Sequence, residues 1–439
     1  MAVPLWLHQV DLLAAHGEPV QCTDALIDGQ GRLEQWGPGV EERARALGLK
    51  PQPATGWLLA PCLVDPHSVL EEPWALQAET LTSLGQAAAA GGYGSLALLP
   101  WARPWRDRPE RLQGLQRPGP LQLRLWGSFS LDGADEDLAL HREQLAAGAI
   151  GLAGGTALPP LPLLERGLLL GAMEDRPVLL SPRSRSLTGG GFVRESVHTL
   201  RAGWPPDPVL SETLPLQSLL ELAQARPDRH LVLMNLSTAA AVHQLQSRRG
   251  RGQACPAATV SWWHLLADTA SLSPTEEGWR VEPALGGPDD REALLHGLRE
   301  GLITAVAVHH LPLDAEEQLL PLDQRRAGVA GHGAPHGLVL PALWQELVVK
   351  RRWSPAELWQ VLCWGPATLL GEEAPQLERG SQRWLLFDPL ASWTWERSDS
   401  LSRAANQPLL GRSLRGQVRA TGLTVPANWS LPAPGSPPD

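Results

Sequence analysis

Eight short apolar runs recur along the middle of the chain with helix-like stretches between them, and this alternation limits the possible folds more than any other feature. Such alternation is typical of repeated βα units around a parallel sheet, and eight units close naturally into a barrel. The expected strands lie at Leu58–Val64, Ser95–Leu99, Leu121–Trp126, Ala149–Leu152, Pro177–Leu180, Leu231–Met234, Ala258–Ser261 and Ile303–Val308. We therefore predict the α/β class, with a (β/α)8 TIM barrel over residues 56–376.

Two helices carry clear sequence signals. Residues 290–300 place Leu294, Leu295 and Leu298 on one face and end before Gly301, a residue that tolerates the left-handed turn of a helix end. Another helix is expected to begin after Ser354, because Ser354 and the glutamate three residues later have the spacing of a capping box.

Two segments outside the barrel read as short strands separated by turns, namely residues 1–55 and 377–425. We expect them to pack together as one small β-sandwich domain built from both ends of the chain. The remaining residues, 426–439, include five prolines and are expected to form a flexible tail.

Composition excludes several classes of function. With 439 residues, 43% of them hydrophobic, the chain can bury a large core. The net charge of −10 is spread along the chain, which argues against nucleic acid as a partner. No apolar run approaches the roughly 18 residues that cross a bilayer, and no secretory leader opens the chain. We expect no membrane association and a cytoplasmic location. The four scattered cysteines predict neither a zinc knuckle nor a disulfide framework.

The first expected barrel strand runs into an Asp-x-His-x-Val motif at residues 65–69. The chain resembles, from about Thr23 to Val425, the dihydroorotase family of the amidohydrolase superfamily, in the class associated with aspartate carbamoyltransferase. Matching segments are Ala87–Tyr93, Leu187–Gly191, Leu236–Ala240, Asp290–Leu294 and Phe387–Pro389. The family motif is Asp-x-His-x-His, whose histidines hold a divalent metal, usually zinc. The resemblance implies a TIM barrel and the hydrolysis of a cyclic amide in pyrimidine biosynthesis.

The metal ligands that the resemblance implies are mostly replaced. His67 matches the first ligand, but Val69 stands at the second and cannot bind a metal. The carboxylate ligand expected after the fourth strand falls within residues 153–156, which contain no acid. The histidine expected after the sixth strand is Asn235, whose neutral amide is a poor zinc donor.

At the last two strands the chain keeps one of the ligands that the resemblance implies, and another residue replaces the catalytic acid. His264 matches a family histidine, and His309 stands where the family has the aspartate that is both metal ligand and general base. His67 and His264 remain as candidate ligands of a single vestigial metal site. A new site built from His309 and His310 is less favoured, because adjacent strand residues point to opposite faces.

The residues that bind substrate in the family have also changed. Glu71 replaces the arginine that pairs with the substrate carboxylate, so a like charge would repel that substrate. Trp101 and Glu282 replace two asparagines. His310 matches a family histidine that helps to bind substrate, and it is the one candidate substrate-binding residue left.

Four tryptophans replace residues near the expected barrel mouth, and they have two interpretations. They could fill a former active-site pocket, or they could form a surface that binds another protein. Filling the pocket is the more economical interpretation. The four are Trp74, Trp101, Trp262 and Trp263.

Two functions follow from these observations. The favoured one is a dihydroorotase-like protein that keeps the barrel but not catalysis, with no cofactor, and with aspartate carbamoyltransferase or a second copy of itself as partner. The alternative is a divergent cyclic amidohydrolase, of dihydroorotase, hydantoinase or allantoinase type, that holds one zinc with His67, His264 and one of His309 and His310. Metal bound by the purified protein would separate the two. A ligand sensor has only the fold in its favour.

Overall fold

The barrel is present, and its strands are short and parallel. The computed structural model describes residues 4–74, 77–115, 120–273, 276 and 278–424. One sheet contains β6, β7 and β8, and a second runs β9, β10, β11, β14, β15 and β16. Their bounds are Leu63–Ser68 for β6, Tyr93–Leu98 for β7, Gln122–Leu125 for β8, Gly127–Ser128 for β9, Leu152–Ala153 for β10, Val178–Leu180 for β11, Leu231–Leu233 for β14, Ala257–Ser261 for β15 and Ala305–Ala307 for β16.

Backbone hydrogen bonds close the two sheets into one ring. At one junction only Trp126 separates β8 from β9, and its amide donates to the carbonyl of Leu98 on the neighbouring strand, at 2.9 Å. At the other, the amide of His309 donates to the carbonyl of His67 at 3.1 Å, and the amide of Val69 donates to the carbonyl of His310 at 2.8 Å. The predicted barrel is therefore confirmed, with β8 and β9 together as its third strand.

One predicted strand is wrong as a single element. Residues 58–64 hold two strands, because β5 (Leu58–Pro61) pairs with β1 and β17 outside the barrel, and only β6 enters it. Pro61 has no amide hydrogen, and the amide of Cys62 donates to Arg383 in the other domain. Because the apolar run is uninterrupted, the sequence gives no sign that the chain passes from one sheet to the other within it.

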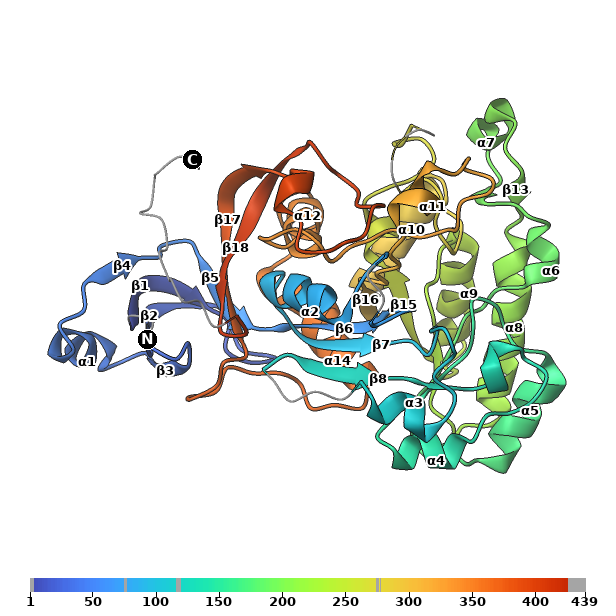
Figure 1. Ribbon diagram of the computed structural model, residues 1–439, viewed down its shortest axis with the longest axis horizontal. Helices are drawn as coiled ribbons and strands as arrows, with labels where there is room; N and C mark the ends of the chain where they lie inside the picture. Colours follow the sequence, from blue (N-terminus) through green and yellow to red (C-terminus); the bar gives the residue numbers. More distant parts are fainter. Residues whose placement is uncertain (1–3, 75–76, 116–119, 274–275, 277, 425–439) are drawn as a thin grey trace.

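Helices lie between the strands and cover the outside of the barrel (Figure 1). They are α2 (Leu81–Ala90), α3 (Pro109–Gln113), α4 (His141–Ala146), α5 (Leu161–Leu170), α6 (Arg185–Thr188), α7 (Val197–Ala202), α8 (Leu210–Ala225), α9 (Ala239–Gly250), α10 (Pro288–Arg299), α11 (Ala315–Leu319), α12 (Val339–Leu343), α13 (Pro355–Trp359) and α14 (Gly365–Leu369). The capping box of α13 is confirmed, since the Ser354 hydroxyl accepts the Glu357 amide at 3.2 Å and the Glu357 carboxylate accepts the Ser354 amide at 2.7 Å. None of the described helices is long and apolar enough to span a bilayer.

The two ends of the chain join in one seven-stranded sheet beside the barrel (Figure 1). Its order is β18, β17, β5, β1, β2 and β3, with β4 also paired to β1. The bounds are Leu5–Leu12 for β1, Gln21–Ile27 for β2, Leu33–Trp36 for β3, Pro51–Pro53 for β4, Trp384–Thr394 for β17 and Ser413–Thr421 for β18, and the short helix α1 (Val40–Ala46) packs against it. The boundaries at residues 55, 376 and 425 stay predictions. The predicted tail, 426–439, lies outside the described residues.

Candidate functional site

The candidate residues gather at the carboxyl ends of the strands, the end at which TIM barrels carry their sites. His67 lies near the end of β6, Asn235 follows β14, and His264 lies in a short 3-10 helix after β15. His309 and His310 follow β16. All five side chains are buried.

His67 and His309 are brought together and bond to each other. Their Nδ1 atoms are 3.1 Å apart, and His67 Nε2 lies 2.9 Å from the hydroxyl of Thr259 on β15. Both ring nitrogens of His67 are therefore already in hydrogen bonds within the protein. Burial, reinforced by the neighbouring His309, lowers the pKa of His67 well below its usual value. Burial lowers the pKa of His309 to about 4, so both rings are neutral at pH 7.

Two residues at the barrel mouth have a strained backbone conformation. Asn235 and His309 have φ angles of 52° and 45°, in the left-handed region that residues other than glycine rarely adopt. The amide of Asn235 donates to the Thr259 hydroxyl at 2.9 Å, so Thr259 links Asn235 to His67. Such strain is concentrated at functional sites, and it persists only where the surroundings hold it.

Replacing Thr259 with valine is expected to lower the free energy of unfolding by about 1–3 kcal/mol, because it leaves the buried Asn235 amide and His67 Nε2 without a partner. Urea unfolding followed by circular dichroism measures the change. Thr55→Val removes an exposed hydroxyl and serves as the control. Equal stability of both variants would show that Thr259 does not hold these groups.

His264 forms its hydrogen bond with a backbone carbonyl. Its Nε2 lies 3.1 Å from the carbonyl of Pro283, and its Nδ1 has no hydrogen-bond partner. Burial lowers its pKa to about 4. Among the described residues, no group of three or more His, Cys, Asp or Glu is arranged to hold a metal. That His67 and His264 together hold a metal stays a prediction.

A second buried network, which the sequence did not reveal, surrounds His310. The ring of His332 lies 3.1 Å from Asp65, and its backbone amide donates to His310 Nδ1 at 3.1 Å. His310 Nε2 stands 3.4 Å from the carboxylate of Glu79, close enough for attraction although not aligned as a hydrogen bond. Burial alone would raise the pKa of Glu79, but His310 and the hydroxyls of Ser402 and Ser83 lower it. A signal for this network was available in the Gly-His-Gly segment at 331–333, where Gly331 lets the backbone approach Val308 and Trp262.

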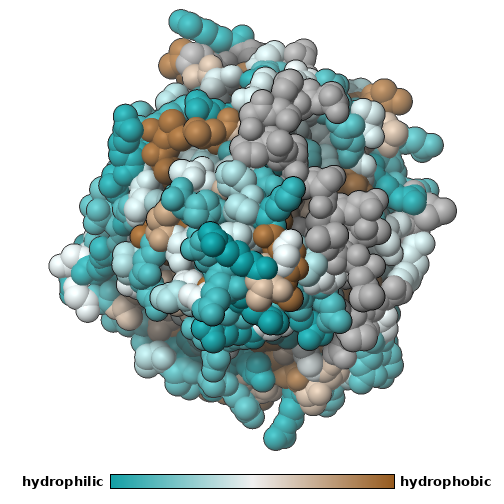
Figure 2. Space-filling view, turned by 90° about the vertical axis from the view of Figure 1, so that its left-hand side faces the viewer, coloured by the Kyte–Doolittle hydropathy of each residue, from teal (hydrophilic) through white to brown (hydrophobic). Residues whose placement is uncertain are grey.

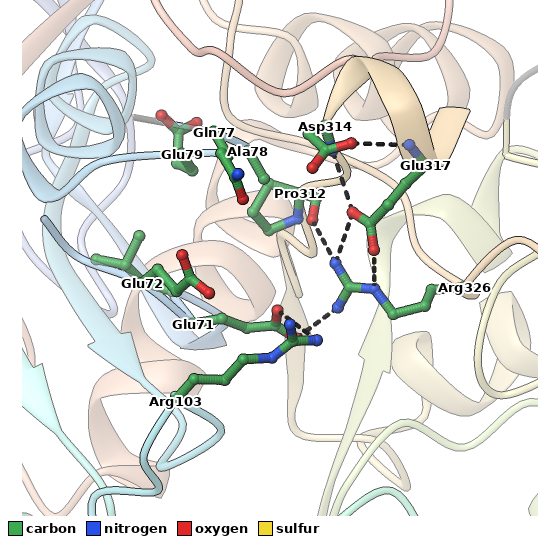
Figure 3. Close-up of a pocket in the computed structure, with 11 residues that line it drawn as sticks. Glu71, Glu72, Gln77, Ala78, Glu79, Arg103, Pro312, Asp314, Glu317 and Arg326 are labelled. Carbon is green, nitrogen blue, oxygen red and sulfur yellow. Dashed lines mark hydrogen bonds and ion pairs between the residues drawn. The ribbon is translucent and has the colours of Figure 1, made fainter. Parts of the chain in front are cut away.

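A small cavity of about 60 Å³ remains beside this network at the barrel mouth (Figure 3). Its wall contains Glu71, whose carboxylate accepts a hydrogen bond of 2.5 Å from Arg326. Arg326 also donates to both oxygens of Glu317, at 2.5 and 2.9 Å. Arg103 stands 3.6 Å from Glu71. Glu71 is therefore neutralised by arginines of this chain.

Three of the four tryptophans are buried near the mouth. Trp101 donates to the carbonyl of Gly154 at 2.9 Å and lies edge-on to His309, and it packs with Val69 in the apolar interior of the barrel. Trp262 and Trp263 are buried beside each other. Trp74, in contrast, is 58% exposed. Filling of the former pocket is thus wrong for Trp74, since it lies on the surface.

A buried ion network occupies another side of the mouth. Arg194 donates to Glu212 at 2.9 Å and to Ser237, which follows β14, at 2.9 Å, and it lies 3.3 Å from Asp207. Arg183 lies 3.6 Å from Asp207 and forms an ion pair with Glu282, the residue at an expected substrate-binding position. The charges at this side of the mouth are therefore paired within the chain.

Comparison with solved structures identifies proteins with the same fold. The fold is similar to solved L-hydantoinase from Arthrobacter aurescens, with a TM-score of 0.75, 17% identity, and 95% of this chain and 94% of that chain covered. Dihydropyrimidinase from Brevibacillus agri gives a TM-score of 0.74 at 17% identity, over 95% of this chain and 93% of that one. These are amidohydrolase-superfamily structures with a TIM barrel and a β-sandwich domain, so the predicted fold class is confirmed.

Comparison with known sequences then identifies the family of this chain. A probable dihydroorotase-like protein of Synechocystis is 34% identical over 401 residues, which cover 84% of this chain and 88% of the relative. Dihydroorotase of Solibacter usitatus is 28% identical over 387 residues, 86% of this chain and 88% of the relative. No family model matches. The chain belongs to the dihydroorotase family, as its sequence predicted.

The side chains at the mouth do not fit the zinc that this family implies. A zinc site needs three or four converging nitrogen, sulfur or carboxylate donors. Val69 offers none and packs in the apolar barrel interior, and Asn235 offers only an amide. The Nδ1 atoms of His67 and His309 are bonded to each other, and His264 is bonded to Pro283.

Proposed function

We propose that this chain is a dihydroorotase homologue without hydrolase activity, which acts through a protein partner in pyrimidine biosynthesis. The observation that carries the proposal is the bond between His67 and His309, because it uses the imidazole nitrogens that a catalytic metal would need. The hydrolysis of a cyclic amide at neutral pH requires a metal-bound hydroxide and a carboxylate that moves protons. His309 stands where the family has that carboxylate.

The ion pair of Glu71 with Arg326 supports the same proposal. Arg326, which could otherwise pair with a substrate carboxylate, is bonded to Glu71 and Glu317. The cavity beside them, about 60 Å³, is small for a cyclic amide. Cavities that bind small molecules usually measure roughly 300–1,000 Å³. The partner we propose is aspartate carbamoyltransferase, with which the class is associated, and the location we propose is the cytoplasm.

A second candidate, a metal-dependent cyclic amidohydrolase of altered specificity, is favoured by one observation. Two imidazole nitrogens that bind one tetrahedral zinc at 2.0–2.1 Å stand about 3.3 Å apart. The Nδ1 atoms of His67 and His309 are 3.1 Å apart, so a metal could replace the hydrogen bond between them without large movement.

Metal content per chain decides between the two candidates. We expect protein purified without chelators to contain far less than one zinc, manganese or iron per chain by inductively coupled plasma mass spectrometry. We also expect no turnover of dihydroorotate or hydantoin after zinc is added. Stoichiometric metal that is lost in His67→Ala, together with hydrolysis of a cyclic amide, would establish the hydrolase instead. His243→Ala, an exposed position on α9, is the matched control.

A further inference from the structure

A polar groove runs between α8 and α9 on the outside of the barrel, at the end of the molecule away from the seven-stranded sheet (Figure 1). Its volume is about 810 Å³, within the range of roughly 300–1,000 Å³ that is usual for sites that bind small molecules. The surface at the opposite end of the molecule is also mostly hydrophilic, with separate hydrophobic patches (Figure 2). A polar surface is thus common on this protein, and a buried positive charge is what distinguishes the groove.

The groove contains a buried arginine without a carboxylate. Arg248, near the end of α9, is 7% exposed, and it donates to the carbonyl of Ala254 at 2.9 Å and to the side chain of Gln224 at 3.1 Å. Glu221 also lines the groove, but it is bonded to Gln217 at 2.8 Å. No Asp or Glu among the described residues forms an ion pair with Arg248. Because an unpaired buried charge is costly, this position favours the approach of an anion.

A second arginine lies beside the first. Arg251 stands at the end of α9, three positions after Arg248, so the two side chains are neighbours on the helix surface. It is exposed and has no ion-pair partner in the part of the chain that the structure describes. Basic residues are favourable at the end of any helix, which accounts for the exposed Arg249, bonded to the carbonyl of Glu300 at 2.7 Å. The helix end does not account for the burial of Arg248.

The groove also contains a buried acceptor without a donor. Gln244, one turn before Arg248 on α9, donates through Nε2 to the carbonyl of Thr213 at 3.3 Å, which fixes the direction of its side chain. Its Oε1 is buried and has no hydrogen-bond partner. Since most buried polar groups in proteins are bonded, an O–H or N–H group of a bound molecule would complete this site.

We propose that the groove binds a phosphate monoester that carries hydroxyl groups, which is the chemistry shared by sugar phosphates and nucleotides. A phosphate monoester has a charge of about −1.5 to −2 at pH 7, which matches the two guanidinium groups of Arg248 and Arg251. A carboxylate would neutralise only one of them. Gln244 lies four residues from Arg248, about 6 Å along the helix, so a hydroxyl group at that distance from the phosphate would donate to its Oε1.

Isothermal titration calorimetry of the full chain at constant ionic strength tests the proposal with ribose 5-phosphate, ribose and inorganic phosphate. We expect ribose 5-phosphate to bind more tightly than inorganic phosphate, and ribose not to bind. Adenosine monophosphate distinguishes the two sources, because tighter binding than ribose 5-phosphate assigns a nucleotide and weaker binding assigns a sugar phosphate. Ribose 5-phosphate that bound no more tightly than inorganic phosphate would overturn the proposal.

Three variants locate the bound molecule. Arg251→Gln removes one charge-assisted contact and should weaken the binding of ribose 5-phosphate and of inorganic phosphate about tenfold. Gln244→Leu removes the free acceptor and should weaken the binding of ribose 5-phosphate alone. Arg249→Gln, at an exposed position of the same helix outside the groove lining, is the control and should change neither.

Equal weakening by Arg249→Gln and Arg251→Gln would show attraction to positive charge in general, and it would contradict a site in the groove. Arg249 and Arg251 are both exposed, so neither variant is expected to disturb the fold. The groove lies on the outside of the barrel and does not depend on whether the barrel mouth is catalytic. This experiment and the metal measurement therefore fail independently.

Discussion

Replacement of Arg194 with methionine is expected to lower the free energy of unfolding by about 3–5 kcal/mol, the usual loss when one partner of a buried ion network is removed. Arg194 is 1% exposed and bonds to Glu212, Ser211 and Ser237 while lying beside Asp207. Methionine fills a similar volume but leaves the buried carboxylate of Glu212 without its cation, and it leaves Asp207 with Arg183 alone. Burial raises the pKa of Glu212, and Arg194 is the first of the groups that counteract this rise.

Urea unfolding at pH 7.5 measures this loss, and Arg142→Met, at an exposed position on α4, is the matched control. A second variant separates the lost partner from the lost packing. Arg194→Met combined with Glu212→Leu removes the charge that was left alone, and it should recover part of the stability. A loss below about 1 kcal/mol for Arg194→Met would show that the network contributes little to folding.

The sequence predicted the features that depend on local pattern. Apolar runs place most barrel strands within a few residues, and the ends of those runs place His67, His264, His309 and His310 at one mouth. The same reasoning failed for residues 58–64, where one apolar run serves two sheets. Local pattern carries no information on which sheet a strand joins.

The contacts at the mouth could not be predicted, because they join residues far apart in the chain. Glu79 and Ser402 are separated by 323 positions, and Glu71 and Arg326 by 255. The sequence showed Glu71 as a charge that repels substrate, but only the fold shows that an arginine neutralises it. Likewise Thr259, which ties His67 to Asn235, is an ordinary strand residue in the sequence.

Acid is expected to destabilise the protein between pH 6.5 and 4, because buried histidines at the mouth are neutral in the folded state. The pKa values of His309 and His264 are about 4, against roughly 6.5 in an unfolded chain. Within this window the unfolded chain binds more protons, so stability falls as pH falls and these two groups cause no further loss below pH 4. Each contributes about 3 kcal/mol at full extent, and Glu212, with a raised pKa, offsets a small part.

Urea unfolding at pH 7.5 and 4.5 measures the change. His309→Asn should reduce it without abolishing it, since asparagine tolerates a positive φ and does not titrate, while His264 and His67 still do. His243→Asn is the exposed control. Equal stability at both pH values would mean that His309 and His264 accept protons in the folded protein as easily as in the unfolded chain. In that case His309 would not be held neutral in its bond with His67, and this bond would no longer argue against a metal.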